Sequence, residues 1–391
     1  MASRGTATTA ARSSASCRPP SPSACSARSS PRTSPTSSPT RWRCAARRSK
    51  RARRKASGEG RRRDMARILV TGGAGYIGSH GCKALRAAGH EPIVFDNFRT
   101  GWRQAVKFGE AIEGDLLDPA ALAAAFERAK PDAVMHFAAL SNVGESVKDP
   151  GLYWRNNVGG SLNLLEAMVA AGTRTIVFSS TAATYGEPEE DPITEAAPQR
   201  PINPYGASKL AVEAMLDDFE RSHGIRSVAF RYFNVAGADE GREVGEHHVP
   251  ETHLVPNILD AAAGAREAIT VNGTDYPTPD GTCIRDYVHV MDLIDAHVLA
   301  TERLLAGGES LRLNLGTGRG FSVAEVVAAA REVVGVDFPV GYGPRRAGDP
   351  ARLVCDGSRA EAVLGWRPAR SVMARMIGDA WAWRQTGRYS A

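Results

Sequence analysis

Short apolar runs alternate with amphipathic stretches from residue 67 to about residue 231. Residues 67–71 are expected to form a buried strand, followed by a glycine-rich turn and a helix that ends near Gly89. A second strand at 91–95 ends at Asp96, which completes one strand–helix–strand unit. Further strands are expected at 111–113, 133–137, 175–179 and 227–231, and helices at 119–129, 152–171 and 205–221. This alternation predicts an α/β fold, a Rossmann-type doubly wound parallel sheet covered on both faces.

The pattern changes after about Asn234. Loops that contain proline and glycine, such as 272–281, alternate there with short helices. We therefore expect a larger domain at 65–235 and a smaller α/β domain at 236–391 that closes over it. The length of this part suits two domains or one large interleaved domain.

Composition separates residues 1–64 from the remainder. The chain has 49 Lys and Arg and 43 Asp and Glu; residues 1–64 hold 17 of the basic and 2 of the acidic residues, which leaves 32 basic and 41 acidic residues. The body is thus acidic, which argues against a general nucleic-acid-binding surface. Residues 1–64 are rich in Ser, Pro, Arg and Ala and poor in large apolar residues, so we expect them to be disordered.

Three interpretations of residues 1–64 remain open. They suit an organelle transit peptide, because they are rich in Ser and Arg and poor in acids. The run at 47–55 would also suit a basic interaction arm. The interpretation we favour is a translated leader ahead of the true start of the protein. Met65 lies directly before the first strand and would be that start. On that view the protein is cytoplasmic, with organelle targeting as the alternative.

Two further features limit the classes of function. No run of about 18 apolar residues occurs, so no membrane span is expected. Three of the six cysteines, Cys82, Cys283 and Cys355, lie scattered in the body without a CxxC pair, and the histidines are not spaced as metal ligands. We therefore expect neither a disulfide framework nor a metal site, and a reducing compartment fits.

The first turn of the sheet carries a dinucleotide fingerprint. Gly72, Gly75 and Gly78 give G-x-x-G-x-x-G between a strand and a helix, which allows close approach of a pyrophosphate to the helix N-terminus. Asp96 follows 18 residues after Gly78, at the end of the next strand. A carboxylate there accepts from ribose hydroxyls and repels a 2′-phosphate, so NAD is favoured over NADP.

Tyr205 and Lys209 supply candidate chemistry. Four residues apart on a helix, they lie on one face, and an ammonium beside a phenol lowers the phenol pKa. Tyr205 is thus a candidate general base with Lys209 as the group that tunes it. The alternative is a surface Tyr and a solvated Lys, but the glycine loop and Ser179-Ser180-Thr181 upstream favour an alcohol/ketone redox site.

These parts together resemble the extended short-chain dehydrogenases/reductases. Longer stretches narrow the resemblance: TGGAGYIGSH at 71–80, VGESV at 143–147, RYFN at 231–234, GTDYPTPDGTCIRDYV at 273–288 and PRRAGD at 344–349. Over residues 66–370 they are similar to the UDP-glucose 4-epimerase family. The resemblance implies NAD as cofactor, a UDP-sugar as substrate and a homodimer formed through the helices at 152–171 and 205–221.

The resemblance also implies roles for individual residues. Tyr205, Lys209 and Thr181 would be catalytic. The cofactor residues would be Gly72, Gly75, Tyr76, Ile77, Gly78, Asp96, Asn97, Asp115, Leu116, Phe137, Ala138, Ala139, Asn156, Ser179, Tyr205, Lys209, Tyr232 and Phe233. The substrate residues would be Thr181, Asn234, Leu254, Arg285, Arg346, Asp349 and Leu353. Ser141, Asn272 and His253 depart from residues found in some members, which leaves details of nucleotide contact open.

The implied reaction interconverts UDP-glucose and UDP-galactose through a transient 4-keto-hexose. A 4,6-dehydratase is the rival on the same fold, but it needs an acid–base pair where Ala182 and Ala183 stand. An NAD-sensing regulator would be expected to lack the Tyr205–Lys209 pair. A nucleic-acid-binding protein is supported by residues 1–64 alone. Leu353, of intermediate size, is expected to line the hexose pocket and to disfavour N-acetyl sugars.

Overall fold

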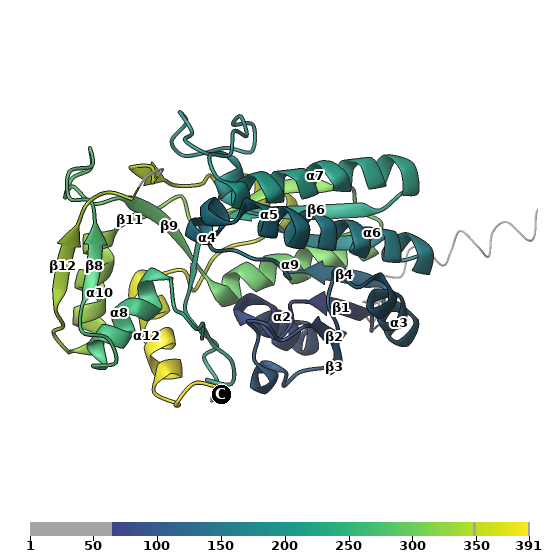
Figure 1. Ribbon diagram of the computed structural model, residues 1–391, viewed down its shortest axis with the longest axis horizontal. Coiled ribbons are helices and arrows are strands. Elements are labelled where there is room, and N and C mark those ends of the chain that lie inside the picture. The colour runs from purple at the N-terminus through teal and green to yellow at the C-terminus, as the bar shows by residue number, and fades with distance from the viewer. Residues whose placement is uncertain (1–64, 347–348, 390–391) are drawn as a thin grey trace, which may run out of the picture. The chain divides into compact units, whose positions relative to one another are not determined.

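The computed structural model describes residues 65–346 and 349–389, so the predictions for residues 1–64 lie outside the described residues. Its centre is a seven-stranded, fully parallel sheet in the order β10-β6-β5-β4-β1-β2-β3 (Figure 1). The strands are β1 (Arg67–Thr71), β2 (Glu91–Asp96), β3 (Glu110–Glu113), β4 (Ala133–His136), β5 (Thr175–Ser179), β6 (Arg226–Tyr232) and β10 (Leu311–Leu315). The predicted Rossmann-type sheet is thereby confirmed.

Helices cover both faces of this sheet because successive strand residues point to opposite sides. On one side Ile68 and Val70 pack in a core with residues of α2 (Tyr76–Ala87), α9 (Val290–Leu305) and α11 (Ser358–Leu364). On the other side Leu69 packs with residues of α3 (Pro119–Ala129), α6 (Gly160–Ala171) and α7 (Pro204–His223). Burial on both faces explains why the central strands β1, β4 and β5 are mainly apolar.

The strand order reverses direction between the neighbouring strands β1 and β4. The chain proceeds from β1 to β2 and β3 on one side, then crosses to β4, β5 and β6 on the other. The loops that follow β1 and β4 therefore diverge at the carboxyl ends of two neighbouring strands. Ligands of open α/β sheets bind at such a reversal point.

A second lobe is built around β9 (Ile284–His289). This strand pairs with β7 (Asn234–Ala236), β11 (Gly320–Ser322) and β13 (Arg352–Leu353), while β8 (Ile269–Asn272) pairs with β12 (Val340–Gly343). The lobe's core lies among α8 (Leu254–Ala262), α10 (Val323–Val334) and α12 (Met373–Arg384). The lobes interleave along the chain, because α9 and β10 lie beyond the expected boundary at residue 235 but belong to the larger sheet and its cover.

The helix expected at 152–171 is interrupted. Instead of one helix the structure has α5 (Pro150–Tyr153), a π-helical turn η3 (Trp154–Gly159) and then α6. Short helices α4 (Val143–Lys148), η2 (Arg103–Ala105) and η4 (Ala182–Thr184) complete the elements. The wide turn carries Asn156 and Asn157, and π-helical turns of this kind recur at functional sites.

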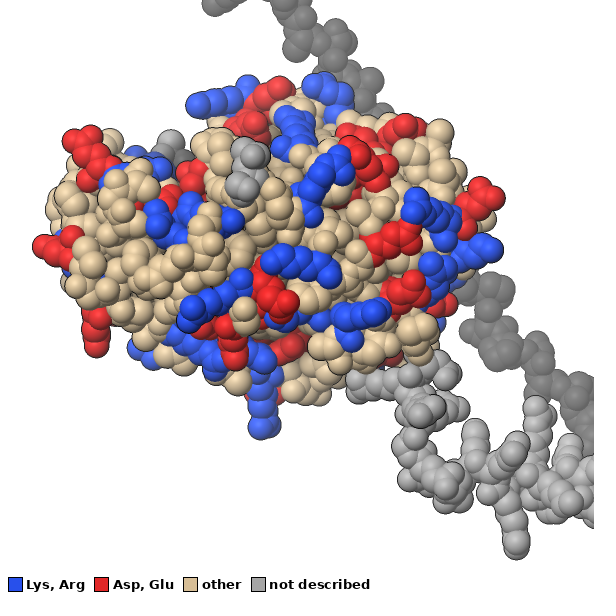
Figure 2. Space-filling model, turned by 90° about the horizontal axis from the view of Figure 1, so that it is seen from below, with Lys and Arg blue, Asp and Glu red and all other residues tan. Residues whose placement is uncertain are grey.

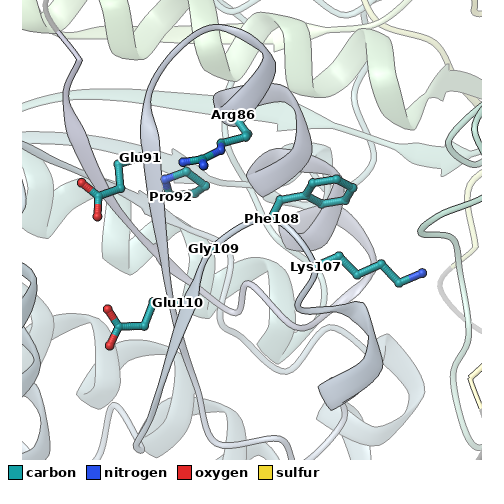
Figure 3. Close-up of a pocket in the computed structure, with 7 residues that line it drawn as sticks. All are labelled: Arg86, Glu91, Pro92, Lys107, Phe108, Gly109 and Glu110. Atoms are coloured by element: carbon teal, nitrogen blue, oxygen red, sulfur yellow. The ribbon is translucent and has the colours of Figure 1, made fainter.

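The surface of the described residues adds two observations. On the face seen in Figure 2, Lys and Arg lie among Asp and Glu without a broad field of one charge. A hollow of about 320 Å³ lies beside the start of β2, lined by Arg86, Glu91, Pro92, Lys107, Phe108, Gly109 and Glu110 (Figure 3). It contains none of the predicted site residues. Within the described ranges, every helix is too short or too polar to cross a bilayer.

Candidate functional site

The glycine loop after β1 is packed too tightly for larger side chains. Gly72 has φ of +73°, and a Cβ on it would lie 2.6 Å from the backbone nitrogen of Ala138. A Cβ on Gly78 would lie 2.1 Å from the carbonyl oxygen of Gly72. Gly75 precedes α2 and has no side chain that could cap this helix. The first backbone N–H groups of α2 therefore have no side-chain acceptor from the N-cap residue. The loop therefore fits the pyrophosphate of a dinucleotide.

Acidic residues follow the loop at the ends of the next two strands. The buried Asp96 carboxylate accepts from the backbone N–H groups of Ala74, at 3.0 Å, and Phe98, at 2.8 Å. Burial raises its pKa, and these two hydrogen bonds oppose the shift. Asn97 donates to the Asp115 carboxylate at 2.9 Å. Asp96 is thus fixed next to the glycine loop, where the sequence predicted a ribose-binding acid.

The remaining cofactor candidates lie at the start of α2 and on the loops that follow β3 and β4. Tyr76 and Ile77 begin α2, and the Tyr76 hydroxyl donates to the carbonyl of Gly237 at 2.7 Å. Phe137 and Ala138 follow β4, and both donate their backbone N–H groups to the carbonyl of Thr71. Ala139 comes next along the chain, and Leu116 is buried at the end of the β3 loop. These contacts join the loops after β1 and β4.

Helix α7 carries the candidate catalytic pair. Its first turn is stabilised by Pro204 and by the Asn203 side chain, which accepts from the backbone N–H of Gly206 at 2.8 Å. The Tyr205 hydroxyl is hydrogen-bonded to that of Thr181, which lies just after β5. One turn along, the Lys209 ammonium donates to the carbonyl of Ser179 at 2.8 Å. The structure therefore brings Thr181, Tyr205 and Lys209 together at the end of β5.

Charge in this site differs from the sequence-based expectation. Burial lowers the pKa of Lys209 to about 7, and burial also raises the pKa of Tyr205. The hydrogen bond from Thr181 opposes the Tyr205 shift. In the protein alone burial therefore disfavours both charged forms, and the tuning of the Tyr205 pKa by Lys209 stays a prediction.

Ser179 and Tyr232 lie next to Lys209, at the ends of β5 and β6. Their hydroxyls are hydrogen-bonded to each other, which links the ends of β5 and β6 behind Lys209. Burial raises the Tyr232 pKa, so this phenol stays protonated. Phe233 follows, and both Phe233 and Leu353 pack against a small buried apolar cluster that includes Ala182. Hydrogen bonds thus link Lys209, Ser179 and Tyr232 at the ends of β5 and β6.

Asn157 is a site residue that the sequence reasoning missed. The predicted Asn156 donates to its neighbour Asn157 at 3.0 Å. Asn157 is buried, exchanges hydrogen bonds with the backbone of Leu140 at 2.9 and 3.0 Å, and donates to Ser208 at 3.1 Å. It joins the loop after β4 to the catalytic helix. The available signal was an Asn pair inside an expected helix, where Asn is unfavourable.

The substrate candidates meet mainly around β9. Asn234 pairs in register with Tyr287 of β9, and Leu353 of β13 pairs with Arg285. The Arg285 guanidinium forms an ion pair with Asp349. Four of the seven predicted substrate residues, drawn from three distant stretches of sequence, therefore lie on or beside one strand.

Arg346 and Leu254 lie on other elements. With its amide turned toward Arg346, Asn272 accepts two hydrogen bonds from the guanidinium at 3.2 Å. Leu254 begins α8 and is partly buried. Arg346 is thereby positioned at the end of β8, and this role of Asn272 was not predicted.

Comparisons with known proteins agree with this geometry. Residues 68–316 match the model of the NAD dependent epimerase/dehydratase family. The chain belongs to this family. It is 52% identical over 316 residues to a UDP-glucose 4-epimerase of Rhizobium leguminosarum bv. trifolii, covering 81% of this chain and 96% of the relative. A UDP-glucose 4-epimerase of Streptomyces lividans is also 52% identical, over 322 residues, covering 82% and 96%.

Solved structures of family members superpose on the body of the chain. UDP-glucose 4-epimerase from Brucella ovis, in complex with NAD, is 50% identical with a TM-score of 0.79, covering 81% of this chain and 97% of that one. The enzyme from Bifidobacterium longum, in complex with NAD+ and UDP, is 37% identical with a TM-score of 0.78, covering 82% and 98%. The family member thus has the fold of structures that hold both ligands.

Proposed function

We propose that this family member is an NAD-dependent UDP-glucose 4-epimerase, which interconverts UDP-glucose and UDP-galactose through a transient 4-keto-hexose. The observation that carries the proposal is the Thr181–Tyr205 hydroxyl pair beside Lys209, at the edge of a dinucleotide-binding sheet. Relatives at about half identity over four-fifths of the chain bear this name. The glycine loop and Asp96 support NAD as the cofactor.

The chain's own residues would handle the proton. Tyr205, ionised, accepts the proton of the sugar 4-hydroxyl and later returns it. Thr181 is hydrogen-bonded to the phenol oxygen and would help to orient it toward the sugar. Bound NAD supplies the hydride acceptor and, in the return step, the donor. Lys209, fixed on the Ser179 carbonyl, provides a cation next to the phenol when it is protonated.

The nucleotide would be held by the second lobe. Arg285 and Arg346 offer guanidinium groups, which bind phosphate oxygens bidentately at fixed geometry. Asp349 and Asn272 orient these two groups. Strong anchoring of UDP, with few fixed contacts to the hexose, would let the 4-keto sugar turn and present its other face. The epimer would then form without net oxidation.

The size of the Leu353 side chain would limit which sugars the site accepts. Leu353 packs against the same buried cluster as Phe233 and lies in register with Arg285, which supports a position between the nicotinamide and the nucleotide anchors. Leu fills more space than Gly or Ala and gives an amide no hydrogen bond, and a buried unpartnered amide costs roughly 1–3 kcal/mol. We expect N-acetyl sugars to be handled about tenfold or more less well than UDP-galactose.

Purified protein incubated with UDP-galactose tests the function directly. We expect UDP-glucose to form without added NAD, and heat-denatured protein to release NAD. Parallel incubation with UDP-N-acetylgalactosamine measures the discrimination by Leu353, which Leu353→Gly should reduce. No conversion of either sugar after reconstitution with NAD would contradict the proposed function. Equal specificity constants would contradict the role of Leu353 alone.

We also propose a homodimer in the cytoplasm. Trp154 and Leu162, on η3 and α6, are large apolar side chains that are 44% and 37% exposed, and α6 packs beside α7. Two copies of such a helix pair would bury these residues in a four-helix bundle. Cys82, Cys283 and Cys355 are free and buried, which suits a reducing compartment. Light scattering at micromolar concentration should give twice the monomer mass; a monomer mass would contradict the dimer.

A further inference from the structure

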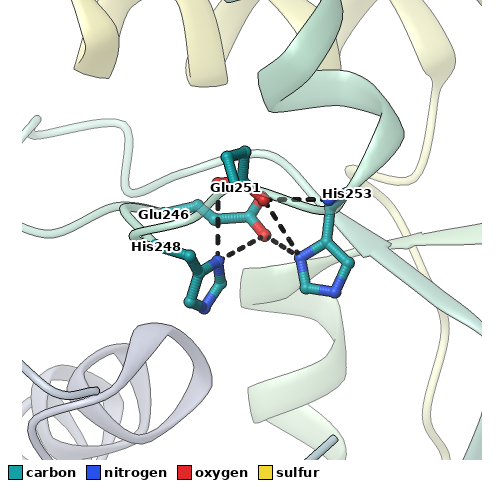
Figure 4. Close-up of side chains that lie close together, drawn as sticks. All are labelled: Glu246, His248, Glu251 and His253. Carbon is teal, nitrogen blue, oxygen red and sulfur yellow. Dashed lines mark hydrogen bonds and ion pairs between the residues drawn. The ribbon is translucent and has the colours of Figure 1, made fainter. Parts of the chain in front are cut away.

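Four potential metal ligands converge in the loop that precedes α8. Glu246, His248, Glu251 and His253 each present one ligand atom, and these atoms all lie within 4.8 Å of one another (Figure 4). The two carboxylate side chains are only 5% and 7% exposed, whereas His253 is half exposed. Spacing along the sequence predicted no metal site; the cluster forms because the loop folds back on itself.

The distances within the cluster differ from those of a simple hydrogen-bond network. The buried Nδ1 atom of His248 makes no hydrogen bond, yet it lies 3.5 Å from both Glu246 Oε1 and Glu251 Oε2. A separation of 3.5 Å is long for an N–H···O hydrogen bond. Tetrahedral ligands bound to zinc at about 2.0–2.1 Å lie about 3.3–3.4 Å apart. His248 is therefore placed as one corner of a metal site would be.

The other histidine completes the arrangement with one adjustment. Nδ1 of His253 lies 3.7 Å from Glu251 Oε1 and 2.6 Å from Glu246 Oε1. The shorter contact is a hydrogen bond, which would have to open by about 0.7 Å around a metal ion. The half-exposed ring of His253 has room for that movement at the mouth of the site.

The surroundings of the carboxylates resemble the support that metal ligands receive. Backbone N–H groups of Thr252 and His253 donate to Glu251 Oε1 at 2.8 and 2.9 Å, which leaves Oε2 directed toward His248. Metal-bound carboxylates are commonly held by hydrogen bonds of this kind. Two buried carboxylates side by side also repel each other, and a divalent cation would neutralise both.

We propose that Glu246, His248, Glu251 and His253 form a binding site for a divalent transition-metal ion, with Zn²⁺ the ion that best suits two imidazole and two carboxylate ligands. The ion acts as a structural clip. It fixes the start of α8, where the predicted substrate residue Leu254 lies, against Tyr76 at the start of α2, whose ring packs on His248. It takes no part in the proton transfer at Tyr205.

Metal analysis of the full-length, tag-free protein tests this site. After equilibration with Zn²⁺ and gel filtration into metal-free buffer, we expect about one Zn²⁺ per chain. Co²⁺ in place of Zn²⁺ should give the intense visible absorption of a tetrahedral site. His248→Gln and Glu251→Gln should each weaken Zn²⁺ binding at least about tenfold in a chelator competition, since even outer-shell changes cost 10–100-fold.

His247→Gln is the matched control. His247 lies in the same loop but stacks on Trp102 with ring centroids 4.6 Å apart, outside the cluster, so its variant should bind Zn²⁺ like the wild type. Wild-type protein that holds neither Zn²⁺ nor tetrahedral Co²⁺ would overturn the proposal and identify the cluster as ion pairs of protonated histidines. Equal Zn²⁺ binding by wild type and both cluster variants would also overturn it. If those variants misfold, as circular dichroism would reveal, the wild-type Co²⁺ spectrum decides alone.

Discussion

A buried ion pair joins the elements around the catalytic residues, and Glu213→Gln should show what breaking this pair costs. Glu213 lies one turn after Lys209 on α7, and its carboxylate accepts from Arg231 Nε at 3.0 Å and Nη2 at 2.6 Å. Both side chains are about 5% exposed. The guanidinium also donates to the Tyr185 hydroxyl at 2.9 Å, and Ser180 donates to Glu213. The pair thereby joins α7 to the ends of β5 and β6.

The expected magnitude follows from burial. Glu213→Gln keeps the shape of the side chain but removes its charge, and Arg231 then lacks the carboxylate with which it pairs among the described residues. Breaking a buried pair from one side typically costs about 3–5 kcal/mol, because desolvation is no longer offset. We expect a loss of that size in the free energy of unfolding. Glu213→Leu combined with Arg231→Met should recover most of it.

Urea unfolding followed by far-UV circular dichroism measures the effect, with NAD in excess for every variant. Glu110→Gln is the matched control, because Glu110 pairs with Arg128 on the surface with side chains 47% and 61% exposed. An exposed pair of this kind contributes about 0–1 kcal/mol. A loss below about 1 kcal/mol for Glu213→Gln, indistinguishable from the control, would refute the reasoning.

Two further predictions concern the site and the core. Tyr205→Phe should lower the epimerisation rate by about 10²–10⁴-fold while leaving NAD and UDP binding intact, and a near wild-type rate would exclude Tyr205 as the base. Burial lowers the pKa of His297 to about 4, and its Nε2 has no hydrogen-bond partner. Between the unfolded value of 6.5 and 4 the unfolded chain binds more protons, so stability falls on acidification, by about 2 kcal/mol from pH 7.5 to 5. His297→Phe should remove that part of the acid dependence in urea titrations, and an unchanged dependence would assign it to other groups.

Much of the fold could be predicted because each unit is locally encoded. The strand at 67–71, the glycine loop and Asp96 lie within 30 residues, and each has a sequence signal of its own: an apolar run, glycines at fixed offsets, an acid at a strand end. The position of β10 could not be predicted in this way. Residues 311–315 join the large sheet only because β6 offers a free edge, which is a property of the assembled sheet.

The site residues also differ in how far their partners lie along the sequence, and this decides which of them could be predicted. Tyr205 and Lys209 are four residues apart, so the helix alone brings them together. Asn157 and Glu213, in contrast, act through partners about 15 to 50 residues away. The cluster of Glu246, His248, Glu251 and His253 spans only eight residues, yet its convergence depends on a loop without regular periodicity. Proximity in a helix can be predicted from spacing, whereas proximity across loops cannot.

The ionisation of Tyr205 and Lys209 depends on burial and cannot be predicted from their spacing in the sequence. The two residues were expected to form an ammonium and a readily ionised phenol, but desolvation lowers the pKa of Lys209 and raises that of Tyr205. The hydrogen bond from Thr181 is the interaction that favours the Tyr205 phenolate. Thr181 should therefore influence at which pH the enzyme works, in addition to orienting the base.

Thr181→Val tests this role, since it replaces the hydroxyl by a methyl group of similar size. A hydrogen bond to a charged group contributes about 1.5–3 kcal/mol, and 1.36 kcal/mol corresponds to one pKa unit. The midpoint of the rise of kcat/KM with pH should thus move up by about 1–2 units, with partial recovery of rate at high pH. Thr184→Val is the control, because the Thr184 hydroxyl donates to the carbonyl of Thr181 at 2.9 Å and not to Tyr205. It should leave the midpoint in place, and an equal shift in both variants, or none in Thr181→Val, would show that Thr181 does not set the ionisation of Tyr205.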